Sequence, residues 1–221
     1  IETGSISFTK PSRVVSYDYD GVMHHYKSKT SDMCVTPNHR MVAKHPISGV
    51  ITKPQSFERK LGRNYLYPSA GKAVGPEHGV TDMMRLLIAV AADGTLRGLC
   101  PTGKPTWRTV DMVLHKKRKI ARVSQLRGNL EIPYSIKPNG DRTVITFNLP
   151  GTTPIDQIKN LGFLGDLSGM SSVRANALVL ELLSWDGTLN GQYSWYSTNP
   201  EAVGKFQAIC ALGGISSICG I

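Results

Sequence analysis

The sequence has little cysteine, and the cysteines it has are not arranged to bind zinc. The chain of 221 residues holds four of them, far apart and without a C-x-x-C pair. It also lacks any uncharged apolar run of about 18 residues and an amino-terminal secretory signal. We therefore expect no membrane segment, an intracellular (cytoplasmic) location and reduced thiols.

Acidic residues are also scarce. The sequence has 16 Asp and Glu against 26 Lys and Arg, which gives a formal net charge of +10 and a pI of about 9.6. Residues 97–127 hold nine basic residues and one acid, Asp111. Hydrophobic residues make up 40% of the chain, enough for a core. These features predict a folded, basic protein with a polyanionic partner.

Hydrophobic periodicity divides the chain into regions of different type. Residues 1–50 favour β structure, with one strand expected near residues 12–17. Glycine and proline interrupt residues 46–76, which indicates a boundary. Farther along, helices are expected at 81–93, 116–130, 172–186 with Ser172 as the cap, and 200–212, and strands at 95–99, 109–115, 134–137, 142–147, 192–196 and 215–221. The Asn139-Gly140 dipeptide predicts a hairpin turn between the third and fourth of those strands.

One unit of sequence occurs twice. Residues 93–98 match residues 186–191 in five of six positions, and an apolar helix precedes each copy. A single Asp-Gly pair is usually only a turn. If the two helices packed about a pseudo-two-fold axis, however, Asp93 and Asp186 would lie side by side, and a divalent cation would relieve their repulsion. Oxygen ligands that water can reach suit Mg²⁺, which also takes a phosphate oxygen.

These residues carry a resemblance. Residues 86–94 and 179–187 look like the two motif copies of monomeric LAGLIDADG homing endonucleases, and the similarity extends roughly over residues 78–221. It implies an α/β (α+β) saddle fold of two αββαββ halves, double-strand cleavage of a long DNA site, and Mg²⁺ dependence. It also implies a monomer, because one chain supplies both halves of the pseudo-dimer.

The resemblance also implies roles for individual residues. Asp93 and Asp186 would be the catalytic, metal-binding acids, and Lys159 would support catalysis, with a solvated surface lysine as the alternative. Bulky Ile88, Leu182 and Trp185 depart from the small residues that the family favours where the motif helices cross. The basic residues expected to contact double-stranded DNA are Arg97, Arg108, Lys116, Lys117 and Lys119.

The amino-terminal region carries a second resemblance. The Thr36-x-x-His39 block, after a turn and a strand, is similar to the corresponding block of Hint domains, the self-splicing modules of inteins. It implies that His39, assisted by Thr36, would protonate an amide at a splice junction. Because the chain begins with Ile1 and ends Cys219-Gly220-Ile221, it lacks the splicing nucleophile and the His-Asn pair, so we expect no splicing by the family route.

Together these patterns predict an intein-type protein with three parts. They are a partial, all-β Hint-like domain at 1–75, a first LAGLIDADG half at 76–154, and a second, incomplete half at 155–221. The expected function is a site-specific DNA endonuclease that hydrolyses phosphodiesters. The alternatives are a DNA-binding remnant with weakened catalysis and a protein-splicing or autoprocessing element without its terminal residues.

Overall fold

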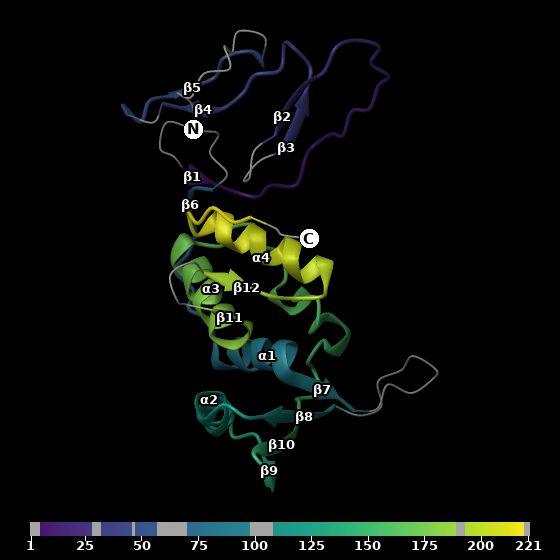
Figure 1. The fold of residues 1–221 in the computed structure, drawn as a ribbon, viewed down its shortest axis with the longest axis vertical. Coiled ribbons are helices and arrows are strands. Elements are labelled where there is room, and N and C mark those ends of the chain that lie inside the picture. Colours follow the sequence, from purple (N-terminus) through teal and green to yellow (C-terminus); the bar gives the residue numbers. More distant parts are fainter. Residues whose placement is uncertain are drawn as a thin grey trace. The chain divides into compact units, whose positions relative to one another are not determined.

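The computed structural model describes residues 5–27, 32–45, 47–56, 70–97, 108–188 and 193–218. The chain forms two compact units, of which the first comprises residues 1–77, 167–175 and 207–221, and the second residues 78–166 and 176–206. The helices α3 and α4 each belong in part to both units. Helices and strands are mixed along the chain (Figure 1).

The described part of the first unit contains three pairs of short strands. β1 (Ser5–Ile6) pairs in parallel with β6 (Lys72–Ala73). Antiparallel pairs join β2 (His24–Lys27) to β3 (Asp32–Val35), and β4 (Ala43–Lys44) to β5 (Ile51–Thr52). The expected strand near residues 12–17 does not form, and Val14 is 83% exposed. An isolated apolar pair without a partner strand buries too little surface to fix the backbone.

The second unit begins with α1 (Asp82–Asp93), which Thr81 caps by accepting a hydrogen bond from the Met84 N–H. A four-stranded antiparallel sheet and a second helix follow. The strands are β7 (Gly94–Leu96), β8 (Thr109–Leu114), β9 (Tyr134–Asn139) and β10 (Arg142–Asn148), in the order β7-β8-β10-β9, and α2 (Lys117–Asn129) connects β8 to β9. The expected Asn-Gly turn is confirmed, because Gly140 has a φ of +63° between β9 and β10.

One face of this sheet forms the core with α1 and α2. In β8, Val110, Met112 and Leu114 are buried, and so are Ile145 and Phe147 of the neighbouring β10. The residues between them point to the opposite face, as the two-residue period of a strand requires. The residues of α1 from Leu86 to Val90 are all buried, so α1 is held firmly over the sheet.

The remaining elements repeat the order of helix, two strands and helix. They are α3 (Ser172–Asp186), β11 (Gly187–Thr188), β12 (Ser194–Trp195) and α4 (Pro200–Leu212), and two short 3₁₀ turns, η2 (Ile155–Gln157) and η3 (Gly162–Leu164), precede α3. Ser171 accepts the capping hydrogen bond from the Arg174 N–H at 3.3 Å, so Ser171 rather than Ser172 caps α3. Residues 215–218 form no strand, and the rest of that expected strand lies outside the described residues.

Within the described ranges, no helix combines the length and apolarity needed to cross a membrane. Two cysteines fall in these ranges, the exposed Cys34 and the buried Cys210, and both are free thiols. Burial raises the pKa of the Cys210 thiol to about 11.

Candidate carboxylate site and basic sheet face

The two halves of the sequence repeat fold alike around their acids. Asp93 is the last residue of α1 and Asp186 is the last residue of α3, and a glycine follows each. A Cβ on Gly94 would lie 2.8 Å from the Val90 carbonyl oxygen, and a Cβ on Gly187 would lie 2.7 Å from the Leu183 carbonyl oxygen. Each helix therefore passes directly into a strand at a position where only glycine fits without displacing backbone.

Lys119 of α2 links the two acids. Its Nζ donates to Oδ2 of Asp93 at 2.5 Å and lies 3.7 Å from Oδ1 of Asp186. Burial, and then the neighbouring charge of Asp93, raise the pKa of Asp186, although Lys119 and Lys159 oppose the rise. The structure thus brings the acids together, and the ammonium of Lys119 offsets part of their repulsion.

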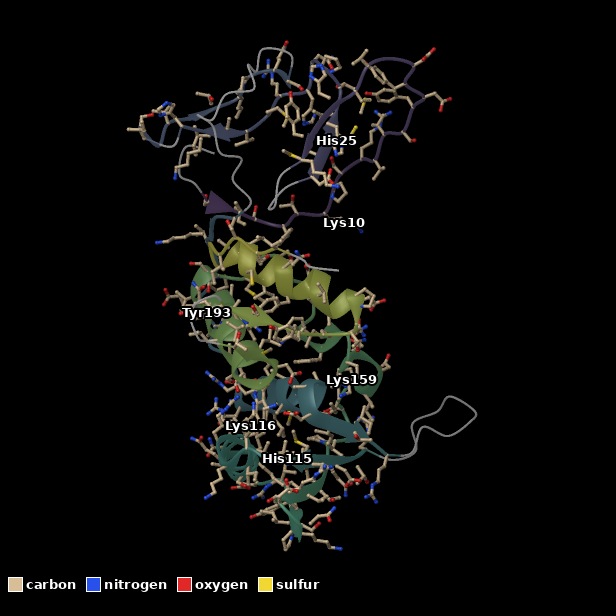
Figure 2. The ribbon with its side chains drawn as sticks, viewed as in Figure 1. Lys10, His25, His115, Lys116, Lys159 and Tyr193 are labelled. Atoms are coloured by element: carbon tan, nitrogen blue, oxygen red, sulfur yellow. The ribbon has the colours of Figure 1, made fainter. Side chains whose placement is uncertain are left out.

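Lys159 lies at the same end of α1 but does not bind a carboxylate. Its Nζ donates to three backbone carbonyl oxygens, those of Val90 at 3.0 Å, Ala91 at 2.8 Å and Gly94 at 2.7 Å. Figure 2 labels this side chain beside α1. A cation at the C-terminal end of a helix interacts favourably with the carbonyl oxygens and the helix dipole there. Partial burial lowers the pKa of Lys159, while the charges of Asp186 and Asp93 act against this change.

The bulky residues of the two helices are accommodated. Leu182 and Trp185 of α3 are buried, as is Ile88 of α1, and together they line a small cavity of about 30 Å³. Ala91, Ala92 and Asp186 line the same cavity. The alanines of α1 therefore leave room for the large side chains of α3.

The carboxylate pair fits a magnesium ion in its donor type. The side chains of Asp93 and Asp186 are 25% and 32% exposed, so water reaches both. Mg²⁺ commonly binds through one or two carboxylates, with waters and phosphate oxygens filling the other positions. Nowhere in the described ranges do three or more His, Cys, Asp or Glu side chains gather as metal ligands. Two acids with Lys119 between them would hold Mg²⁺ weakly until a phosphate oxygen joined them.

The basic residues expected on DNA have different surroundings. Lys116 and Lys117 are exposed at the start of α2, and Figure 2 labels Lys116 there. Arg97 is exposed and pairs with Asp111. Arg108 instead donates to the carbonyl oxygens of Pro150 at 3.1 Å and Thr153 at 2.5 Å. Because of those bonds, the guanidinium of Arg108 is directed at the protein backbone and not at solvent. The buried Lys119 is likewise directed at Asp93 and Asp186.

The face of the sheet away from α1 and α2 is mostly polar and carries cations, although the register also places Val113 and Val144 on it. The strand register places Thr95, Asp111, Thr146 and Ser135 in one row across β7, β8, β10 and β9. Asp111 accepts a hydrogen bond from Thr146 at 2.7 Å in addition to its ion pair with Arg97. The exposed cations of β9 and β10, Lys137 and Arg142, belong to the same face, together with Asn139, Thr109 and Asn148.

Thr36 and His39 lie in a turn that follows β3 in the first unit. The His39 N–H donates to the Thr36 carbonyl oxygen at 3.0 Å, and Thr36 Oγ1 donates to Asn38 at 2.8 Å. His39 is exposed and Thr36 is half-buried. These contacts describe a local turn.

Sequence reasoning missed a second charged cluster, centred on Glu181 of α3. This side chain is 4% exposed and accepts hydrogen bonds from Arg85 at 2.6 Å and Arg122 at 2.7 Å. The Trp185 indole also donates to it, at 3.1 Å. Burial alone would raise the pKa of Glu181, but the bonds from Arg122, Trp185 and Arg85 outweigh burial and lower it. The available signal was an acid within the apolar stretch of α3.

Comparisons with known proteins give relatives with two different named activities. Over 99% of this chain, an alignment of 254 residues shows 27% identity to the ribonucleoside-diphosphate reductase subunit beta of Aquifex aeolicus (strain VF5) and covers 36% of that protein. A segment of 39 residues is 49% identical to part of the ATP-dependent Clp protease proteolytic subunit of Chlamydomonas moewusii, covering 18% of this chain and 4% of that protein. No family model matches the chain.

The chain thus spans about a third of the reductase subunit, which is by its name an enzyme. In both relatives the aligned part is a minority of the protein, and the names of the two relatives share no activity. Relatedness to an enzyme is therefore established, but the names alone do not assign a reaction to this segment.

The comparisons contradict the family and function expected from the sequence. The relative aligned along nearly the whole chain is named for ribonucleotide reduction, and neither relative is named for an intein, a Hint domain or a LAGLIDADG homing endonuclease. The expectation of an intein-associated DNA endonuclease is corrected on this finding, and so are its alternatives of a weakened endonuclease remnant and a splicing element. Binding of double-stranded DNA and of Mg²⁺, which the basic residues and the acid pair also indicate, stays a prediction. The roles of Thr36 and His39 were implied only by the Hint resemblance, which neither relative supports.

Proposed function

We propose that the second unit binds double-stranded DNA through the open face of its sheet, and that Asp93 and Asp186 bind Mg²⁺ together with a backbone phosphate. The observation that carries the proposal is the polar, cationic face formed by β7, β8, β10 and β9. Lys137, Arg142 and Arg97 supply positive charge, and serine, threonine and asparagine supply donors and acceptors. Arg97 is paired with Asp111, and the Nε of Arg142 lies 3.8 Å from Oδ1 of Asp141. On the other face, Val110, Met112, Leu114, Ile145 and Phe147 are buried in the core.

The chemistry of this face suits a duplex. Lysine and arginine contact phosphates and release counterions, which gives binding its affinity and salt dependence. Side chains on strands reach base edges in the major groove, which accommodates a two-stranded ribbon. The β9–β10 hairpin is such a ribbon, and every residue of β9 is exposed.

The carboxylate pair lies where this face begins. Asp93 immediately precedes β7, the edge strand that carries Thr95 and that Arg97 directly follows. A phosphate near that edge would complete the coordination of a cation held by Asp93 and Asp186. Lys159 holds the end of α1 in place, and Lys119 limits the repulsion of the acids while no metal is bound.

The test is fluorescence anisotropy with a labelled duplex of about 30 base pairs, titrated at several KCl concentrations. We expect affinity to fall linearly with the logarithm of salt concentration, and the slope to drop by about one for Lys137→Gln or Arg142→Gln. Lys44→Gln removes an exposed lysine of the first unit and serves as the matched control. Absence of binding at low salt, or equal losses in all three variants, would count against the proposal.

A part in ribonucleoside-diphosphate reduction is the second candidate function, which the alignment along 99% of the chain favours. Its test is to incubate the full chain with a ribonucleoside diphosphate and a dithiol reductant, with and without a reductase partner subunit, and to assay the deoxy product. Product above a heat-inactivated control would support this candidate. No product in either mixture would exclude it.

A further inference from the structure

A second basic site lies between α1, α2 and α3, away from the open face of the sheet. It is a cavity of about 410 Å³, a size typical of small-molecule pockets. Among the described residues, four cations line it, namely Arg85 from α1 and Arg118, Lys119 and Arg122 from α2, and Glu181 is the one acid in that lining. Positive charge is therefore in excess inside the cavity.

Glu181 arranges the arginines without neutralising them all. Its buried carboxylate holds Arg85 and Arg122 at 2.6 and 2.7 Å, which fixes two guanidinium groups at the cavity wall. Each guanidinium has five N–H donors, so donors remain for a ligand. Arg118 donates instead to the Ser184 carbonyl oxygen, which carries no formal charge. Its full charge is thus available.

The geometry points to a binding site for a small phosphorylated anion of the diphosphate class. Planar guanidinium groups bind phosphoryl oxygens in pairs, and this cavity presents three such groups from two helices. The cavity exceeds what one phosphate fills, which leaves space for two linked phosphoryl groups. Leu180 and Ala177 give its remaining wall an apolar character that would accommodate the rest of a larger ligand.

This site is separate from the surface proposed for DNA. Arg118 and Lys117 are neighbours on α2, yet Arg118 lines the cavity and Lys117 does not. Both are exposed and each carries one positive charge, so Arg118→Gln and Lys117→Gln change the net charge equally. The two variants therefore distinguish binding in the cavity from attraction to the basic surface.

The experiment is isothermal titration calorimetry of the full chain with inorganic pyrophosphate, in buffer free of phosphate and divalent metals. We expect saturable binding that Arg118→Gln weakens at least tenfold and Lys117→Gln changes less than twofold. Absence of saturable binding at millimolar pyrophosphate, or equal weakening in both variants, would overturn the inference. Melting curves of both variants establish that each is folded.

A second arm uses the labelled DNA duplex with Arg118→Gln and with Lys137→Gln, which removes a cation of the open sheet face. The inference predicts that Arg118→Gln leaves duplex affinity within twofold of the parent chain, whereas Lys137→Gln weakens it. Weakening by Arg118→Gln without any pyrophosphate binding would assign the cavity to backbone phosphates and overturn the inference. Pyrophosphate binding without duplex binding would refute the proposed function but support the cavity site, so the two failures are distinguishable.

Discussion

At the scale of single residues, the ionised carboxylate of Asp186 lowers the free energy of unfolding. The pKa of Asp186 is raised, so the folded state binds its proton more tightly than the unfolded state does. This group therefore opposes folding above its folded pKa, and the cost disappears as the pH falls below its ordinary value near 3.8. Active or binding sites often retain such a cost because the charges serve a ligand.

Asp186→Asn should consequently stabilise the metal-free protein at pH 7. We expect a higher midpoint in urea than for the parent chain, with the difference shrinking as the pH approaches 3.8. Asp156→Asn, at an exposed acid of η2, is the control and should shift the free energy of unfolding by no more than about 0.5 kcal/mol. Destabilisation by Asp186→Asn at pH 7 in EDTA would contradict this interpretation.

Glu181 should show the opposite pH dependence. Its pKa is lowered, so its ionised form stabilises the fold above the ordinary value of 4.5, and this contribution is lost as the pH falls through the folded pKa. Glu181→Gln should cost about 2–3 kcal/mol at pH 7, since it leaves Arg85 and Arg122 without their shared partner, although water still reaches both. Urea denaturation of the parent chain and the variant at pH 7 and pH 3 measures the loss in the free energy of unfolding at each pH. A loss of equal size at both pH values would contradict the assignment.

At the scale of elements, the strongest local signals were reliable. The apolar run after Thr81 and the Asp93-Gly94 stop predicted α1, and Asn139-Gly140 predicted the β9–β10 hairpin. The weaker signals failed where a neighbouring element decides the outcome. The expected strand near 12–17 does not form. At the N-terminal end of α3, Ser171 rather than Ser172 accepts the capping hydrogen bond.

The site was predictable in part. The duplicated Asp-Gly unit predicted that Asp93 and Asp186 meet, because both copies share one local pattern. The positions of Lys119 and Lys159 were not predictable, since their partners are distant in sequence and the three partners of Lys159 are backbone carbonyl oxygens. Every residue has a backbone carbonyl, so residue identity does not indicate which carbonyl accepts such a bond. The saddle arrangement of the two halves stays a prediction.

The glycines that follow the acids should be intolerant of side chains. Gly94→Ala would place a methyl group 2.8 Å from the Val90 carbonyl oxygen, and we expect a loss of about 1–3 kcal/mol in the free energy of unfolding. Gly204, inside α4, has no atom within 4 Å of an added Cβ. Gly204→Ala should therefore stabilise the protein by up to about 1 kcal/mol. Thermal melts of both variants test the pair, and a neutral Gly94→Ala would refute the close approach.

At the scale of the whole molecule, the excess positive charge is used in three ways. Lys119 and Lys159 maintain the acid pair and the end of α1, and Arg85 and Arg122 hold Glu181. The remaining exposed cations include Lys137 and Arg142 on the open face of the sheet, and they give the chain its affinity for polyanions in this account. A net charge of +10 alone would not have distinguished these uses.

The central claim is that the open sheet face and the carboxylate pair act together on double-stranded DNA. Its most direct test is the affinity of the full chain for a labelled duplex in EDTA and in millimolar Mg²⁺, compared with Asp93→Asn and Asp186→Asn. The account predicts salt-dependent binding that Mg²⁺ strengthens in the parent chain, and that this gain is lost in both variants. No duplex binding at low salt, or the same Mg²⁺ effect in all three proteins, would contradict it.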